Sequence, residues 1–188
     1  MTMKPLLPTA AAALALLTLS GCGKSDTGPK TMDQAKQEAA KLDRPKPGQY
    51  SQKMTVTKFE VPGAPPQMAE QMKAAMGKAQ EHSFCLTEEM AGKGFQDMFD
   101  KVGNDGECKY DRFDVSGGKL DAVLQCENKT EGKGVITLAG TVSETGSDVT
   151  VSIEQQGGHA PMANAKIAMH LVSQRTGDCT GGEKILGK

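Results

Sequence analysis

The chain has 188 residues, with 22 Lys or Arg against 23 Asp or Glu and a formal net charge of −1 at pH 7. Charges of both signs are interspersed, unlike the basic footprint of a nucleic-acid-binding protein, so we expect no nucleic-acid partner. Trp is absent, and two Tyr and five Phe stand against 22 Gly and 11 Met. Length and composition therefore predict one domain with a modest core.

The N-terminal segment has the layout of a secretory signal. Lys4 is followed by an apolar run at 6–19 that is too short to cross a bilayer, and the small residues Ser20 and Gly21 come before Cys22. The stretch "LSGC" resembles the lipobox of bacterial lipoproteins. This resemblance implies cleavage before Cys22 and attachment of lipid to it. The alternative is an ordinary secretory signal followed by a cysteine that carries no lipid.

We therefore expect a lipoprotein signal peptide at 1–21, a lipidated N-terminus and flexible tether at 22–47, and a single disulfide-bonded domain at 48–188. Gly23 stands where lipoproteins held at the inner membrane commonly have Asp, and the resemblance thus implies the outer membrane. The expected location is the cell envelope, facing the periplasm, with the membrane as a partner through the N-terminal lipid.

Within the tether, residues 33–42 carry a weak helix signal. The stretch has almost no apolar face, so we expect a solvated spacer. The folded domain starts near Gly48 with a half-buried strand, in which Tyr50, Met54 and Val56 alternate with polar residues.

A helix is predicted from the Pro65-Pro66 pair onward. Three Met repeat every four residues on one side of it, at Met68, Met72 and Met76. In the main interpretation they face the sheet and fill its core. In a second they line a groove for an apolar ligand, and in a third they bind copper together with His159 and Met162.

A short strand at 82–87 leads to Thr87, which is predicted to cap a helix that runs to about Phe99. The rest of the chain reads as strands. A first hairpin is followed by a second that turns at Thr145-Gly146, and a last strand reaches Cys179. This order predicts an α+β fold, mainly a curved antiparallel β-sheet or open half-barrel with one or two helices packed on it.

Four cysteines remain beside Cys22, and an even number in an exported protein predicts two disulfides. In the first hairpin a three-residue loop at 116–118 sets Cys108 opposite Cys126, near disulfide range. A two-residue Gly-Gly turn would shift this register by one residue. The predicted pairs are Cys108 with Cys126 and, by elimination, Cys85 with Cys179.

Four short motifs carry a family resemblance. They are "KPGQY" at the first strand, "FCLT" before a helix, the Cys-to-Cys hairpin and "RTGDC" near the end. Their order resembles the domain of unknown function family 3617, small exported proteins of Gram-negative bacteria, over about Pro45 to Cys179. Tyr50 stands where that family often has a bulkier aromatic residue. Because no activity is established for the family, the resemblance implies a scaffold and not a mechanism.

The sequence gives little support for an enzyme. The nucleophile motif G-x-S-x-G and the zinc motif H-E-x-x-H are both absent, and the histidines are widely spaced, at His82, His159 and His170. The stretch at 100–107 lacks the ligand pattern of a calcium loop. We expect no catalytic residue, no metal site and no cofactor.

The expected function is a non-enzymatic binding or interaction module of the cell envelope, with an apolar ligand or an envelope protein as its partner. Two alternatives remain open. One is a copper-binding protein that uses Met and His, and the other is a structural envelope lipoprotein that acts by protein contacts.

Overall fold

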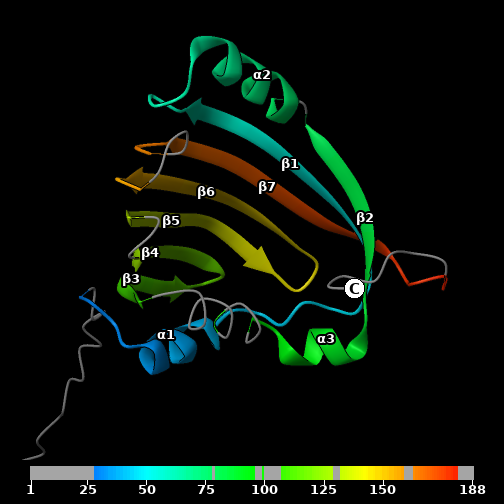
Figure 1. Ribbon diagram of the computed structural model, residues 1–188. Coiled ribbons are helices and arrows are strands. Elements are labelled where there is room, and N and C mark those ends of the chain that lie inside the picture. Colours follow the sequence, from blue (N-terminus) through cyan, green and yellow to red (C-terminus); the bar gives the residue numbers. More distant parts are fainter. Residues whose placement is uncertain are drawn as a thin grey trace, which may run out of the picture.

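The computed structural model describes residues 28–77, 79–95, 99, 107–128, 132–158 and 163–181. In these residues the chain forms a seven-stranded antiparallel sheet with a few short helices, which is the predicted α+β class (Figure 1). The elements are α1 (Met32–Ala39), β1 (Gly48–Glu60), α2 (Pro66–Met76), β2 (Gln80–Leu86), α3 (Glu88–Lys93), β3 (Glu107–Ser116), β4 (Lys119–Asn128), β5 (Gly132–Ser143), β6 (Gly146–Gln156) and β7 (Lys166–Gly177).

The strand order across the sheet is β2-β1-β7-β6-β5-β4-β3. Strands β3 to β7 follow one another as a meander, because each is joined to the next along the chain and pairs with it. The first strand, β1, pairs with the last strand, β7, and β2 folds back along the other side of β1. Figure 1 shows that these long strands bend, so the sheet is curved.

The two faces of the sheet differ in polarity, because residues that pair across neighbouring strands have the same character. One row, running from β1 to β3, contains Val56, Met169, Val151, Leu138, Ala122 and Phe113. The neighbouring row on the opposite side contains Thr55, His170, Thr150, Ala139, Asp121 and Asp114. We call the side of the first row the apolar face. The predicted alternation of β1 is confirmed, since Tyr50 and Met54 share this face with Val56.

The segment before β1 packs on the apolar face, although a solvated tether was predicted there. Helix α1 begins with a capping box between Thr31 and Gln34. Ala35 and Ala39 are buried against β3 and β4, together with Leu42. The prediction was wrong because it looked for large apolar residues, whereas two alanines spaced by four give a helix a small apolar stripe that lets it lie close to the sheet.

Helix α3 is shorter than predicted. Thr87 caps it as expected, since its hydroxyl accepts a hydrogen bond from the backbone N–H of Met90. The helix ends at Lys93, because Gly94 adopts φ 58°, outside the helical region and favourable only for glycine. Phe99, the predicted helix end, is nevertheless buried, and its ring packs against Tyr110 and Phe113 with centroids 5.9 and 5.5 Å away.

The first hairpin reaches the predicted cysteine register by a different route. The turn is the two-residue Gly117-Gly118 pair, both with positive φ, rather than the predicted three-residue loop. A bulge at Asp111 then inserts one extra residue in β3 and restores the register, so that Cys108 lies opposite Cys126. The bulge also brings Tyr110 to the same face as Phe113, and both side chains are buried there.

Both predicted cysteine pairs are brought together. The Cα atoms of Cys108 and Cys126 are 4.0 Å apart, and those of Cys85 and Cys179 are 5.6 Å apart, each pair with bonded sulfurs. The second hairpin turns at Glu144-Thr145, one residue before the predicted position, because Ser143 pairs with Gly146. The last strand, β7, leads to Cys179 as predicted.

The three Met of α2 do not fill the core, and that prediction was wrong. No residue of α2 is buried, Met68 is 43% exposed, and Met72 and Met76 are half-buried. The helix lies beyond the end of the β1–β2 pairing and contacts β1 (Figure 1). Among the described residues, the main contact of this helix is with β1. Among the described residues, no helix is long and apolar enough to cross a membrane.

Candidate functional site

The apolar face is only partly covered. On β3 and β4 it is closed by α1 and Phe99, and its side chains there are buried. Across β1, β7, β6 and β5 most of its large side chains are half-buried instead, although Tyr50 and Val142 are buried. This part, which we call the open apolar face, comprises Met54, Val56, Ile167, Met169, Leu171, Val149, Val151, Ile153, Ile136 and Leu138. A contiguous apolar surface of this kind is typical of a binding site.

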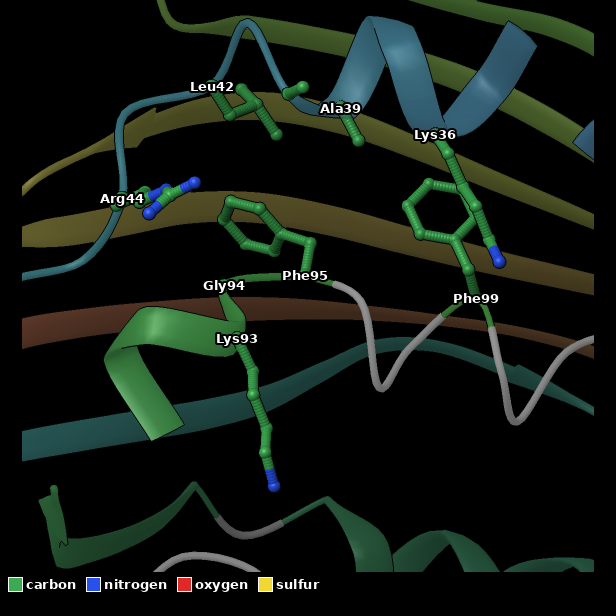
Figure 2. A pocket seen from close by; sticks show the side chains of 9 residues that line it. Lys36, Ala39, Leu42, Arg44, Lys93, Gly94, Phe95 and Phe99 are labelled. Carbon is green, nitrogen blue, oxygen red and sulfur yellow. The ribbon is translucent and has the colours of Figure 1, made fainter. Parts of the chain in front are cut away.

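Two cavities lie between the helices and the apolar face. The first, the α1–α3 cavity, has a volume of about 250 Å³ and opens between α1 and the end of α3 (Figure 2). Its apolar lining includes Ala39, Leu42, Phe95 and Phe99. Figure 2 shows the rings of Phe95 and Phe99 between α1 and the strands of the sheet.

The second, the α3–sheet cavity, also has a volume of about 250 Å³ and lies against the sheet itself. Tyr50, Phe84, Leu86 and Met90 line one side of it, and Val142 lies on the lining contributed by β5. The rings of Tyr50 and Phe84 are stacked with centroids 5.7 Å apart. The lining is thus mostly apolar and aromatic, as in sites that bind small organic molecules.

Gly94 and Phe95 line both cavities, so the two are neighbours separated by one aromatic ring. Together they come within the roughly 300–1,000 Å³ of common small-molecule sites. Tyr50 contributes a phenol hydroxyl to the second cavity. Its hydroxyl donates to the carbonyl of Lys46 at 2.7 Å, and burial raises the pKa of this hydroxyl, so it stays neutral there.

The mouth of the α1–α3 cavity is cationic. Lys36 comes from α1, Arg44 from the segment that follows it, and Lys93 from the end of α3. No carboxylate lines this cavity in the part of the chain that the structure describes. Figure 2 shows Lys36 and Arg44 on the two sides of the Phe95 and Phe99 rings, whereas Lys93 extends away from them. Lys93 forms an ion pair with Glu89 at 3.2 Å.

Three of the four motifs of the family resemblance, all but the Cys-to-Cys hairpin, meet in one corner and serve the fold. The Arg175 Nε donates to the carbonyl of Pro47 at 2.8 Å, and its guanidinium also contacts Asp178. Gly48 has φ 144°, and a Cβ there would collide with the Gly177 carbonyl. The Cys85–Cys179 pair lies beside this corner, joining the end of β2 to the segment after β7. These residues therefore fix the first strand to the last.

The two described histidines, His82 and His170, lie on opposite faces of the sheet. His82 projects from β2 on the side of the apolar face, with its ring 6.2 Å from that of Phe84. His170 lies on the polar side of β7, 2.7 Å from Asp148. His159 lies outside the described residues, as does most of the stretch 100–107.

Among the described residues, no group of three or more His, Cys, Asp or Glu could hold a metal ion, so they add no site for the copper hypothesis. Met162, which was considered for copper beside the α2 methionines, lies outside that part of the chain. Cys22 and the signal segment also lie outside it. Lipidation therefore stays a prediction from the sequence.

Sequence reasoning missed the cavity residues. The signals that could have found them are the alanines of α1 spaced by four and the Phe95 and Phe99 pair with the same spacing, since both patterns place a buried side on a helical segment. The cationic mouth has no linear signature, because its residues come from separate elements.

Comparison with known proteins gives one match. No curated protein and no solved structure matches the chain. The model of the family described as "Protein of unknown function (DUF3617)" matches residues 45–179. This range runs from the residues just before β1 to the cysteine that closes the domain, and so includes the whole sheet. The chain therefore belongs to the DUF3617 family.

Proposed function

We propose that the protein is a non-enzymatic binding module of the cell envelope that holds the acyl chain of a lipid-like ligand against its open apolar face. The observation that carries this proposal is the ladder of half-buried aliphatic side chains across β5, β6, β7 and β1, beside two mostly apolar cavities. An acyl chain removes such side chains from water, which gains about 25 cal/mol per Å² of apolar area buried.

The proposed location follows from the sequence. The lipobox at Cys22 would anchor the N-terminus in the membrane, with the domain facing the periplasm. A domain held at a lipid surface meets amphiphilic molecules at high local concentration, which supports an acyl chain as the ligand.

The binding test uses the uncharged dye phenylnaphthylamine, whose fluorescence rises in apolar surroundings. Val151→Asp places a carboxylate in the middle of the open apolar face and should weaken dye binding at least about tenfold, because a charge buried without a partner is costly. Thr150→Asp is the matched control, since it adds the same group one residue away on the polar side of β6. Equal binding by the two variants would contradict the proposal.

A second measurement identifies the natural occupant. Native mass spectrometry of protein purified from envelopes should show an added mass that extraction with organic solvent removes and that analysis assigns to a lipid. A mass that corresponds to a copper ion, lost on addition of a chelator, would instead support the copper alternative.

A further inference from the structure

We propose that the ligand is an anionic amphiphile whose head group is held by Lys36 and Arg44 at the mouth of the α1–α3 cavity. This inference rests on the proposed function and specifies the chemistry of the ligand. The apolar chain would pass Phe95 into the α3–sheet cavity and continue onto the open apolar face.

The first support is the combination of charge and apolar lining in one cavity. The full chain carries a formal net charge of −1, so positive charge is not in general excess. In the α1–α3 cavity, however, the charged residues among the described lining are all cations, and the rest of that lining is apolar or backbone. A cationic rim around an aromatic interior matches a molecule with an anionic head and an apolar body.

The second support is the placement of the two cations. Lys36 is half-buried on α1, and its aliphatic stem lies along the cavity wall while Figure 2 shows its amine beside Phe99. Arg44 is exposed and makes no hydrogen bond or ion pair within the described residues. Its guanidinium can therefore take a carboxylate or phosphate with two parallel hydrogen bonds.

The third support is the path from the mouth to the open apolar face. Phe95 is half-buried and lines both cavities, so one ring separates the cationic mouth from the aromatic wall of Tyr50 and Phe84. Ser147 and Ser173 line the far side of the second cavity. They are followed along β6 and β7 by members of the open apolar face, Val149 and Leu171. The chain of a bound amphiphile would thus stay in contact with apolar side chains.

The test measures displacement of phenylnaphthylamine from the full chain in nanodiscs of neutral phosphatidylcholine, with empty nanodiscs subtracted. The competitors are dodecyl phosphate, dodecanol and dodecyltrimethylammonium, which share one chain and differ in head-group charge. Dodecyl phosphate should compete about tenfold better than dodecanol in low salt, and this preference should shrink as salt is added. Dodecyltrimethylammonium should compete worst.

The double variant Lys36→Glu with Arg44→Glu should abolish the preference for phosphate over alcohol. The matched control, Lys53→Glu with Lys119→Glu, makes the same change of net charge on the polar side of the sheet and should keep the preference. Because Arg44 is exposed, the single variant Arg44→Gln leaves the packing intact. It should lower the preference severalfold.

The outcomes separate this inference from the proposed function. Equal competition by dodecyl phosphate and dodecanol would overturn the inference and leave the apolar site in place. So would an unchanged preference in the Lys36 and Arg44 variants. If inorganic phosphate competes as well as dodecyl phosphate, the inference that the ligand is an amphiphile is overturned, and the result indicates a site for simple anions. If no dye binds to begin with, the proposed function itself fails.

Discussion

Phe95 and Phe99 line the same cavity, but truncating them should affect stability and ligand binding to different extents. Phe99 is 2% exposed and packs against the rings of Tyr110 and Phe113, whereas Phe95 is half-buried between two cavities. Phe99→Ala removes a fully buried ring and leaves a void, which should cost about 3–5 kcal/mol in the free energy of unfolding. Phe95→Ala gives up about half of the roughly 1.5–3 kcal/mol that full burial contributes, so it should cost about 1 kcal/mol.

For ligand binding, Phe95→Ala should have a larger effect than Phe99→Ala. Phe95→Ala should weaken phenylnaphthylamine binding about tenfold, because the ring contributes to the walls of both cavities. Phe95→Leu is the control, since it keeps an apolar side chain at this position. Unfolding is followed by urea titration and far-ultraviolet circular dichroism, because the chain has no Trp for fluorescence. The reasoning is refuted if Phe95→Ala costs 3 kcal/mol or about as much as Phe99→Ala, or if it leaves dye binding unchanged.

Two further predictions concern alkaline stability and lipidation. Burial raises the pKa of Tyr110 to about 12 from its ordinary 10.0, so the folded state holds this proton more tightly than the unfolded state. The contribution of this group to the free energy of unfolding is therefore complete below pH 10. It declines between about pH 10 and 12, by up to about 1.4 kcal/mol per pH unit. Tyr110→Phe should flatten this decline in urea titrations, and an identical pH profile would contradict the assignment. Separately, Cys22→Ala should yield uncleaved or soluble protein in cell fractionation, whereas a correctly processed, membrane-bound variant would argue against lipidation.

The sheet could be predicted because its signal is local. In β1 the alternation of Tyr50, Met54 and Val56 with polar residues gives both the strand and the side that faces inward. The register of the β3–β4 hairpin was harder to predict. Two features that each shift the pairing by one residue, the Gly117-Gly118 turn and the bulge at Asp111, cancel one another, so the cysteines pair although the turn was assigned wrongly.

The site was less predictable, since it depends on contacts between distant segments. Helix α1 docks through Ala35 and Ala39, residues too small to stand out in a hydrophobic pattern. The Met side of α2 is conspicuous in the sequence, yet no residue of that helix is buried. The cavity mouth joins Lys36 and Arg44 to the end of α3, which lies much later in the chain, and no pattern along the sequence reports such proximity.

The pairing of the first strand with the last also governs when the fold can form. Gln49 pairs with Gly177, so β1 has no partner on that side until nearly the whole chain is available. Contacts between such distant residues slow folding, and an unpaired strand edge beside exposed aliphatic side chains invites aggregation. Cys85 likewise cannot form its disulfide until Cys179, 94 residues later, is available, and before then it can react with other thiols. During synthesis from the N-terminus the open apolar face is therefore exposed before β7 is available, and holding chaperones and disulfide exchange would protect the chain until β7 follows.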